Sequence, residues 1–264
     1  KKISWKNAYE IIVKKINKTS PEKIACFIGD LTNMETMYVA KEFFDKTIKS
    51  KNLECRSDHV YVNNNIRSNY IFNSNINGIE ESDLIILVGT NPRYEATILN
   101  ARIRKSFLKN KTEIYSIGDV GDLTYPYKAL LNNSKIIKDI CDNNHEISNK
   151  IINAKKPMVI IGQSALKLKS GNYIFESFKN FLISKKKIND EWNSLNIISE
   201  NASTVGGYDL DLLSSDNGKN TVLEETEKNN FEVIFLIGQD NINFKKQNEF
   251  IIYIGSHGDR GAEL

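Results

Sequence analysis

Short apolar runs rich in β-branched residues recur along the chain, and a glycine directly follows each of them. Glycine at a strand end permits a sharp turn, because it tolerates backbone conformations that other residues avoid. Strands of parallel sheets have this continuous apolar composition, since helices cover both of their faces. The pattern therefore predicts buried parallel strands at Ile24–Ile28, Leu84–Val88, Glu113–Ile117, Met158–Ile161, Val233–Ile237 and Phe250–Ile254.

Longer amphipathic segments lie between these runs. Met34–Ile48 has apolar residues at helical spacing, whereas the polar, Asn-rich segment Asn63–Asn77 favours turns and loops. His59–Val62 is a further candidate strand, which would be the second in chain order. Alternation of strands and helices predicts an α/β fold with mostly parallel sheets and Rossmann-like strand–helix units. Such sheets bind ligands at the carboxyl ends of their strands.

A domain boundary is expected where Lys155 and Lys156 precede Pro157. This predicts a first α/β lobe over residues 1–154, which contains the Gly-Thr-Asn-Pro segment, and a second α/β lobe over residues 155–264. The second lobe looks truncated at its carboxyl end.

The segment Gly89-Thr90-Asn91-Pro92 has the strongest local signals in the chain. Asn91 is suited to cap a helix, because its side-chain oxygen accepts an unpaired backbone N–H. Pro92 suits the first helical position, where no N–H is needed. A helix that begins directly after a buried strand presents N–H groups to an anion or a phosphate. An ordinary strand–helix joint is the alternative interpretation.

Composition narrows the possible functions. The chain has 264 residues, of which 40% are hydrophobic, and its 36 basic and 33 acidic residues nearly balance. A globular protein is expected, and the balance argues against nucleic acid as a partner. No apolar run reaches the roughly 20 residues that span a bilayer. Cys26, Cys55 and Cys141 are too scattered for a disulfide framework or a metal clip.

Other candidate sites are weaker. The glycine-rich segment Gly255–Gly261, with His257 and Asp259, lacks the dinucleotide-binding spacing, so a structural loop is the simpler interpretation. Neither His59 nor His145 has a partner at metal-ligand spacing. The remaining candidates, a carboxylate pair and a basic cluster, are most simply a solvated loop and a helix end: Asp209 and Asp211, and Lys185–Lys187. We expect no catalytic residue and no metal ligand in the chain.

Several segments together resemble a known family. They are residues 82–96 (SDLIILVGTNPRYEA), 99–106 (LNARIRKS), 122–125 (DLTY), 154–162 (AKKPMVIIG), 164–166 (SAL) and 251–262 (IIYIGSHGDRGA). In this order they are similar to the large iron–sulfur subunit of respiratory complex I, in its molybdopterin oxidoreductase-like domain. The resemblance covers most of the chain and is weakest between Phe175 and Phe231.

The resemblance implies where cofactors belong. In catalytic relatives, a loop of the Gly89–Pro92 type helps to hold the pterin nucleotide, and a Cys, selenocysteine, Ser or Asp ligates molybdenum near the position of His59 to Tyr61. No thiol occurs there, and Cys55 lies slightly earlier. Gly89, Thr90, Asn91 and Pro92 are therefore expected to be a vestigial pterin-site loop, with no cofactor in this chain. Iron–sulfur clusters need closely spaced thiolates, so they are expected in an upstream region or on a partner chain.

The function implied is that of a noncatalytic structural domain in the peripheral arm of complex I, which transfers electrons from NADH to quinone. Its implied partners are the other subunits of that arm, including the cluster-bearing part of the same subunit. Its implied location is peripheral, on the matrix side of the mitochondrial inner membrane or the cytoplasmic side of a bacterial one. Two alternatives remain: an active molybdopterin-dependent oxidoreductase fragment and a free-standing nucleotide-binding module.

Overall fold

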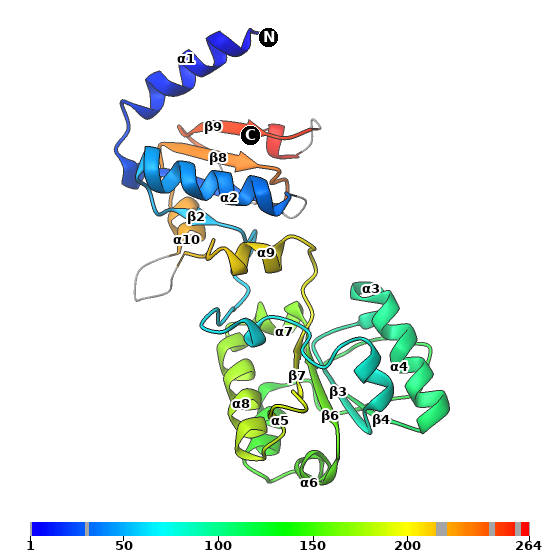
Figure 1. Cartoon of the computed structure of the whole chain (residues 1–264). Coiled ribbons are helices and arrows are strands. Elements are labelled where there is room, and N and C mark those ends of the chain that lie inside the picture. The colour runs from blue at the N-terminus through cyan, green and yellow to red at the C-terminus, as the bar shows by residue number, and fades with distance from the viewer. Residues whose placement is uncertain (1, 30–31, 215–220, 243–245, 257–259, 264) are drawn as a thin grey trace. The chain divides into compact units, whose positions relative to one another are not determined.

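The structure is a computed structural model, and it describes residues 2–29, 32–214, 221–242, 246–256 and 260–263. The chain forms two compact units. Unit 1 comprises residues 1–59 and 201–264, and unit 2 comprises residues 60–200 (Figure 1). Within the described parts, no helix combines the length and the apolar character needed to cross a membrane.

Unit 1 contains a parallel sheet with the strand order β2-β1-β8-β9. Its strands are β1 (Ile24–Ile28), β2 (Leu53–Glu54), β8 (Val233–Ile237) and β9 (Phe250–Ile254). Its helices are α1 (Trp5–Ile16), α2 (Met34–Phe43), α9 (Thr204–Asp209) and α10 (Val222–Glu227), with a π-helical turn η2 (Phe44–Ile48) and 3₁₀ turns η1 (Pro21–Lys23) and η5 (Arg260–Glu263).

Apolar side chains hold unit 1 together on both faces of its sheet. Phe44 of η2 packs edge-to-face on Phe235 of β8, with ring centroids 5.4 Å apart. Phe27 belongs to a separate buried cluster with Val222 and Leu223 of α10. Strand β1 is buried along its whole length, as its unbroken apolar sequence predicts.

Unit 2 contains a five-stranded parallel sheet with the order β5-β4-β3-β6-β7. Its strands are β3 (Leu84–Val88), β4 (Glu113–Ile117), β5 (Lys128–Ala129), β6 (Pro157–Ile161) and β7 (Leu195–Ile197). Its helices are α3 (Pro92–Glu95), α4 (Thr97–Asn110), α5 (Ser134–Cys141), α6 (Glu146–Asn153), α7 (Gln163–Leu166) and α8 (Gly171–Ser184), with 3₁₀ turns η3 (Arg67–Asn69) and η4 (Asn77–Glu81).

Strand β3 shows how the core of unit 2 is built. Leu84, Ile86 and Val88 contribute to one buried cluster, together with residues of α5, α6 and α8. Ile85 and Leu87 point to the other face and join a second cluster that includes Ile103 of α4. Alternate side chains of a strand project to opposite faces, so helices cover both sides of this sheet. The predicted α/β fold with mostly parallel sheets is confirmed.

Two expectations differ from the structure. The units do not follow the division at residues 154 and 155, because β6 hydrogen-bonds to β3 within one sheet and β8 hydrogen-bonds to β1 within the other. Pro157 begins a strand instead of a domain. The prediction of a strand at His59–Val62 is also wrong: β2 lies earlier, at Leu53–Glu54. Val60 is buried in the core of unit 2, and the Tyr61 N–H donates to the Leu166 carbonyl, so this segment is used for packing.

Candidate functional site

The Gly89–Pro92 segment, termed here the strand-end loop, lies at the point where the connections of the unit 2 sheet diverge. From β3 the chain continues to β4 on one side, whereas β6 lies on the other side. The strand-end loop follows β3, and Gly162 follows β6. Ligands of open α/β sheets bind in the crevice at this switch point. The sequence-predicted loop is therefore in the position that a ligand site of this fold class would occupy.

Two glycines allow the loops after β3 and β6 to pack against each other. Gly89 has a φ of +54°, and a Cβ placed there would lie 2.7 Å from the Ala165 Cβ. A Cβ on Gly162 would lie 2.5 Å from the Thr90 Cβ and 2.6 Å from the Gly89 oxygen. The Ser164 hydroxyl donates to the same Gly89 carbonyl. Backbone therefore fills the space that side chains would otherwise occupy.

The predicted helix start is confirmed at Asn91 and Pro92. The Asn91 side-chain oxygen accepts the Arg93 N–H at 3.0 Å, and Pro92 is the first helical residue. The helix does not continue unbroken, however, since α3 ends at Glu95 and α4 begins at Thr97. Ala96 between them has φ −152° and ψ 69°, which is not helical. Apolar spacing could not reveal this break, because the periodicity of Leu99, Ile103 and Phe107 continues on α4 alone.

Glu95 is a residue of the site that the sequence prediction missed. One oxygen of its carboxylate accepts the Asn91 backbone N–H at 2.7 Å, and the other accepts the Thr90 hydroxyl, also at 2.7 Å. These donors belong to the loop that would face an anionic ligand. An acidic side chain within the first turn after a helix cap often turns back to the capping residue. That signal was present in the sequence.

The remaining polar groups of Asn91 also have partners inside the protein. Its amide nitrogen donates to the Val120 carbonyl at 2.6 Å, in the segment that follows β4. The Arg93 guanidinium lies 2.5 Å from the Asp122 carboxylate of the same segment. The Thr124 backbone N–H, with a further contribution from Arg93, lowers the pKa of Asp122 below its usual value. Hydrogen bonds thus connect the strand-end loop to the segment after β4.

The three thiols lie apart in different elements. Cys26 is buried within β1, Cys55 is buried directly after β2, and Cys141 ends α5. Burial raises the pKa of Cys26 far above its usual value, and burial together with nearby Asp142 raises the pKa of Cys141 to about 12. Metal ligation requires the thiolate, which both environments disfavour. Among the described residues, no group of three or more His, Cys, Asp or Glu side chains is arranged to hold a metal ion.

The other sequence candidates have local structural roles. His145 caps α6, since its Nδ1 accepts the Ile147 N–H at 3.2 Å, and the exposed His59 lies 3.0 Å from Glu227. Asp209 ends α9, and Asp211 follows with a left-handed φ of 57°. Lys185–Lys187 follow the last residue of α8, where the Lys187 amine donates to the Ala154 carbonyl. His257 and Asp259 lie outside the described residues.

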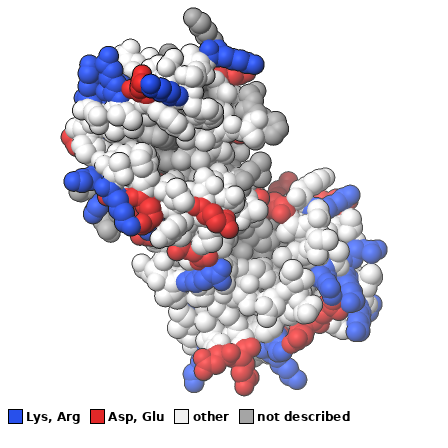
Figure 2. Space-filling model, turned by 45° about the horizontal axis from the view of Figure 1, so that its top comes forward, with Lys and Arg blue, Asp and Glu red and all other residues white. Residues whose placement is uncertain are grey.

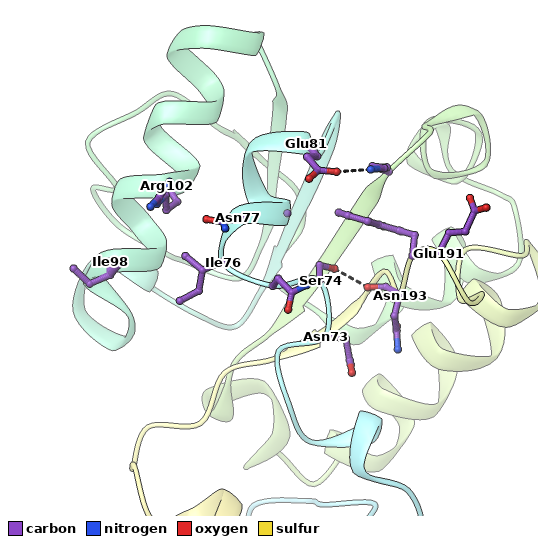
Figure 3. A pocket seen from close by; sticks show the side chains of 13 residues that line it. Asn73, Ser74, Ile76, Asn77, Glu81, Ile98, Arg102, Glu191 and Asn193 are labelled. Carbon is purple, nitrogen blue, oxygen red and sulfur yellow. Dashed lines mark hydrogen bonds and ion pairs between the residues drawn. The ribbon is translucent and has the colours of Figure 1, made fainter.

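A second concave region of unit 2 lies at the opposite edge of the sheet, where residues preceding β3, β6 and β7 meet. Its volume is about 840 Å³, and its lining includes Lys156 and Trp192. Figure 3 shows Ile76 and Ile98 on one side and Glu191 on the other. The Lys156 amine lies 5.2 Å from the centre of the Trp192 ring and pairs with Glu81. On the face drawn in Figure 2, acidic and basic side chains are interspersed over the surface.

These features define a class: an open parallel α/β protein with a glycine-flanked loop at its switch point, whose donors already have an internal partner. The family model of molybdopterin oxidoreductases matches residues 1–264. The chain belongs to the molybdopterin oxidoreductase family.

Several curated relatives are similar over essentially the whole chain. The NADH-ubiquinone oxidoreductase 75 kDa subunit of Reclinomonas americana is 33% identical, covering 100% of this chain and 40% of its own length. The mitochondrial NADH dehydrogenase [ubiquinone] iron-sulfur protein 1 of Solanum tuberosum is 30% identical, covering 98% and 34%. An NADH-quinone oxidoreductase subunit from Rickettsia bellii is 32% identical, covering 98% and 37%. The chain therefore spans two fifths or less of the length of these relatives.

Proposed function

We propose that this chain is a noncatalytic structural domain of the large iron–sulfur subunit in the peripheral, NADH-oxidising arm of respiratory complex I. Similarity over the whole chain to proteins with that subunit's names supports membership. The role within the complex is inferred from the strand-end loop. Iron–sulfur clusters would lie on the part of the subunit that the relatives carry outside the matched region, or on a partner chain.

The observation that carries the noncatalytic role is the position of Glu95. In a phosphate site at a helix start, backbone N–H groups and hydroxyls face the anion. Here the Asn91 N–H and the Thr90 hydroxyl both donate to the Glu95 carboxylate. A phosphate brought to within 4 Å of that carboxylate would be repelled by about 4 kcal/mol at an effective dielectric constant near 20. The loop does not fit the phosphate of a pterin nucleotide, so no chemical step is assigned to it.

Packing of the loop points the same way. Thr90 is only 2% exposed, and the backbones at Gly89 and Gly162 leave no space for added side chains. Asn91, Arg93 and Thr90 instead fix the start of α3 and its connection to the segment after β4. We infer that the loop maintains the architecture of the domain. The domain would then support the cluster-bearing part of the subunit and contact other subunits, as a peripheral component on the matrix or cytoplasmic side of the membrane.

Two measurements on the native assembly test this proposal. Native fractionation of solubilised membranes should place the chain with NADH dehydrogenase activity, and consistent separation would remove the complex I assignment. Elemental and pterin analysis of that fraction should find no molybdenum, tungsten or pterin bound to this chain. Their presence at one equivalent would favour an active molybdopterin enzyme instead.

A third measurement tests the role of Glu95 and the nucleotide-binding alternative. Calorimetric titration of the wild-type chain with nucleoside diphosphates should give no binding heat. Glu95→Ala frees the Thr90 hydroxyl and the Asn91 N–H, so this variant is the one expected to gain weak phosphate binding. Glu95→Gln, which keeps an oxygen acceptor and loses the charge, is the matched control. Tight binding by the wild type would contradict the proposal and support a nucleotide-binding module.

A further inference from the structure

Helix α1 has an apolar stripe that the described structure leaves uncovered. Trp5, Tyr9, Ile12 and Ile16 follow a spacing of four, three and four residues, which places them on one face of a helix. All twelve residues of α1 are described, and none is buried. Trp5 is 77% exposed and Tyr9 is 58% exposed. In Figure 1, α1 extends away from the strands of its own unit.

An isolated helix of this length requires a partner surface. Helices shorter than about 12 to 15 residues are marginal in water, and most helical stability in proteins comes from packing an apolar face. Local signals do favour α1, because the Ser4 hydroxyl oxygen accepts the Asn7 N–H and Lys14 and Lys15 lie in its last turn. Those signals contribute little energy beside the burial of a tryptophan and three further apolar side chains.

The charge around α1 indicates the chemistry of its partner. Residues 2–18 contain a single acidic residue, Glu10, and five lysines: Lys2, Lys6, Lys14, Lys15 and Lys18. Within the described parts of the chain, none of these lysines forms an ion pair. A basic helix of this kind matches an acidic surface.

The width of the stripe favours a protein groove over a membrane surface. A four-three-four spacing forms the narrow seam typical of helix packing against other helices. Helices that lie in a membrane interface bury a wider apolar face. Ile11, which is 50% exposed, projects away from this seam and gives α1 no continuous wide face.

The relatives indicate where such a groove could come from. Each has three fifths or more of its length outside the region that matches this chain. Uncovered apolar side chains also occur elsewhere in unit 1, since Tyr38 and Val39 of α2 are 53% and 64% exposed and Ile254 of β9 is 51% exposed. Further polypeptide packing on unit 1 would cover them.

We propose that α1 docks through Trp5, Tyr9, Ile12 and Ile16 into an apolar groove rimmed by carboxylates. The groove lies on the part of the large subunit that the relatives carry outside the matched region. This inference rests on the proposed membership of complex I, and it adds a specific contact by which the domain is held in the assembly.

Photo-crosslinking in the assembled complex tests the contact. The crosslinker p-benzoylphenylalanine replaces Tyr9 on the stripe or, as a control, Asn7 on the opposite face, and native membranes are irradiated. Position 9 should crosslink to an Asp- and Glu-rich peptide of the large subunit at least fivefold more strongly than position 7. Crosslinks from position 9 to lipid or to another copy of this chain, equal labelling from both positions, or no crosslink would each overturn the proposal.

A pair of isoleucine variants tests the energetics. Ile12→Asp places a charge on the stripe, whereas Ile11→Asp places the same charge beside it. Retention of the chain in the salt-washed complex should fall at least tenfold for Ile12→Asp and less than twofold for Ile11→Asp. Thermal melts of the two isolated variants should coincide, which shows that folding is not the cause. Equal retention with the chain still in the complex would refute the docking contact and leave the proposed function standing.

Discussion

The two units use the same kind of parallel sheet but complete it to different degrees. In unit 2, helices on both faces bury the side chains of β3, and two apolar clusters enclose the sheet. In unit 1, the strands have equally apolar sequences, yet α1 contains no buried residue among those described and β9 is only partly buried at the sheet edge. Unit 2 therefore builds a complete core from its own residues, whereas unit 1 presents apolar surface for further polypeptide.

The strand-end glycines, by contrast, behave alike in both units. A Cβ on Gly29, after β1, would lie 1.7 Å from the Gly238 oxygen, just as one on Gly162 would meet Thr90 and Gly89. In unit 1 the Thr32 hydroxyl donates to the Ile237 carbonyl at 3.1 Å. Strand-end glycines therefore position tight backbone contacts, while polar side chains decide what each loop can bind.

The largest effect is expected from the buried ion pair of unit 1. Glu54 is fully buried, and its carboxylate accepts bonds from the Arg56 guanidinium at 2.7 and 2.9 Å and from the Ser214 hydroxyl at 2.8 Å. Glu54→Ala removes the acceptor and should destabilise unit 1 by about 3–5 kcal/mol, because it leaves a buried guanidinium without this partner. Hydrogen exchange should accelerate across residues 1–59 and 201–264.

The matched control is Glu81→Ala in unit 2, which removes an exposed partner of Lys156. Exposed ion pairs contribute little to stability, so exchange should change little there. If Glu54→Ala accelerated exchange equally in both units, the units would unfold together and the comparison between them would fail.

A smaller loss is expected from Gly162→Ala in unit 2. The φ of Gly162 is −92°, so an alanine is conformationally acceptable and its cost is steric. The new methyl group would press on Thr90 and the Gly89 carbonyl, and overpacking of this kind costs about 1–3 kcal/mol. Urea unfolding in a Trp5→Phe background, where Trp192 reports on unit 2, measures the loss. An unchanged midpoint would mean that the loop is more accommodating than its geometry indicates.

The opposite sign is expected from Gly206→Ala in α9 of unit 1. The nearest atoms to the new Cβ would be those of the Met34 side chain, at 3.9 Å, so there is room for it. Alanine in a helix is favoured over glycine by about 0.5–1 kcal/mol. Slower hydrogen exchange in α9 would verify the gain, whereas faster exchange would show that this part of unit 1 is packed as tightly as the loop of unit 2.

The smallest effect is a pH dependence in unit 2. The Lys150 amine and the Tyr115 hydroxyl lower the pKa of Glu113 below 4.5 in the folded state. A lowered pKa stabilises the folded form above the unfolded value, and this contribution disappears as the pH falls through the folded pKa. Glu113→Gln should therefore lose up to about 1 kcal/mol at pH 7, and its unfolding midpoint should approach that of the wild type below pH 4.5. A difference that persists at low pH would exclude the ion pair as its source.

The sequence determined the local elements where a residue pattern was long enough to specify them. All six apolar runs became strands, and Asn91 with Pro92 began a helix as expected. The short strands β2, β5 and β7, of two or three residues, carry too little pattern for detection. Burial of Val60 in the core of unit 2 also shows that a β-branched run can serve packing instead of a sheet.

Only the tertiary structure decided which strands pair and what the strand-end loop can bind. Pairing of β6 with β3 and of β8 with β1 depends on adjacency in space, so no boundary motif at Pro157 could predict the two units. Glu95 is visible in the sequence, but its effect depends on two hydrogen bonds that exist only after α3 folds back toward the loop. Residue patterns thus specified local conformation, whereas long-range packing determined which donors, faces and edges remain available for a partner.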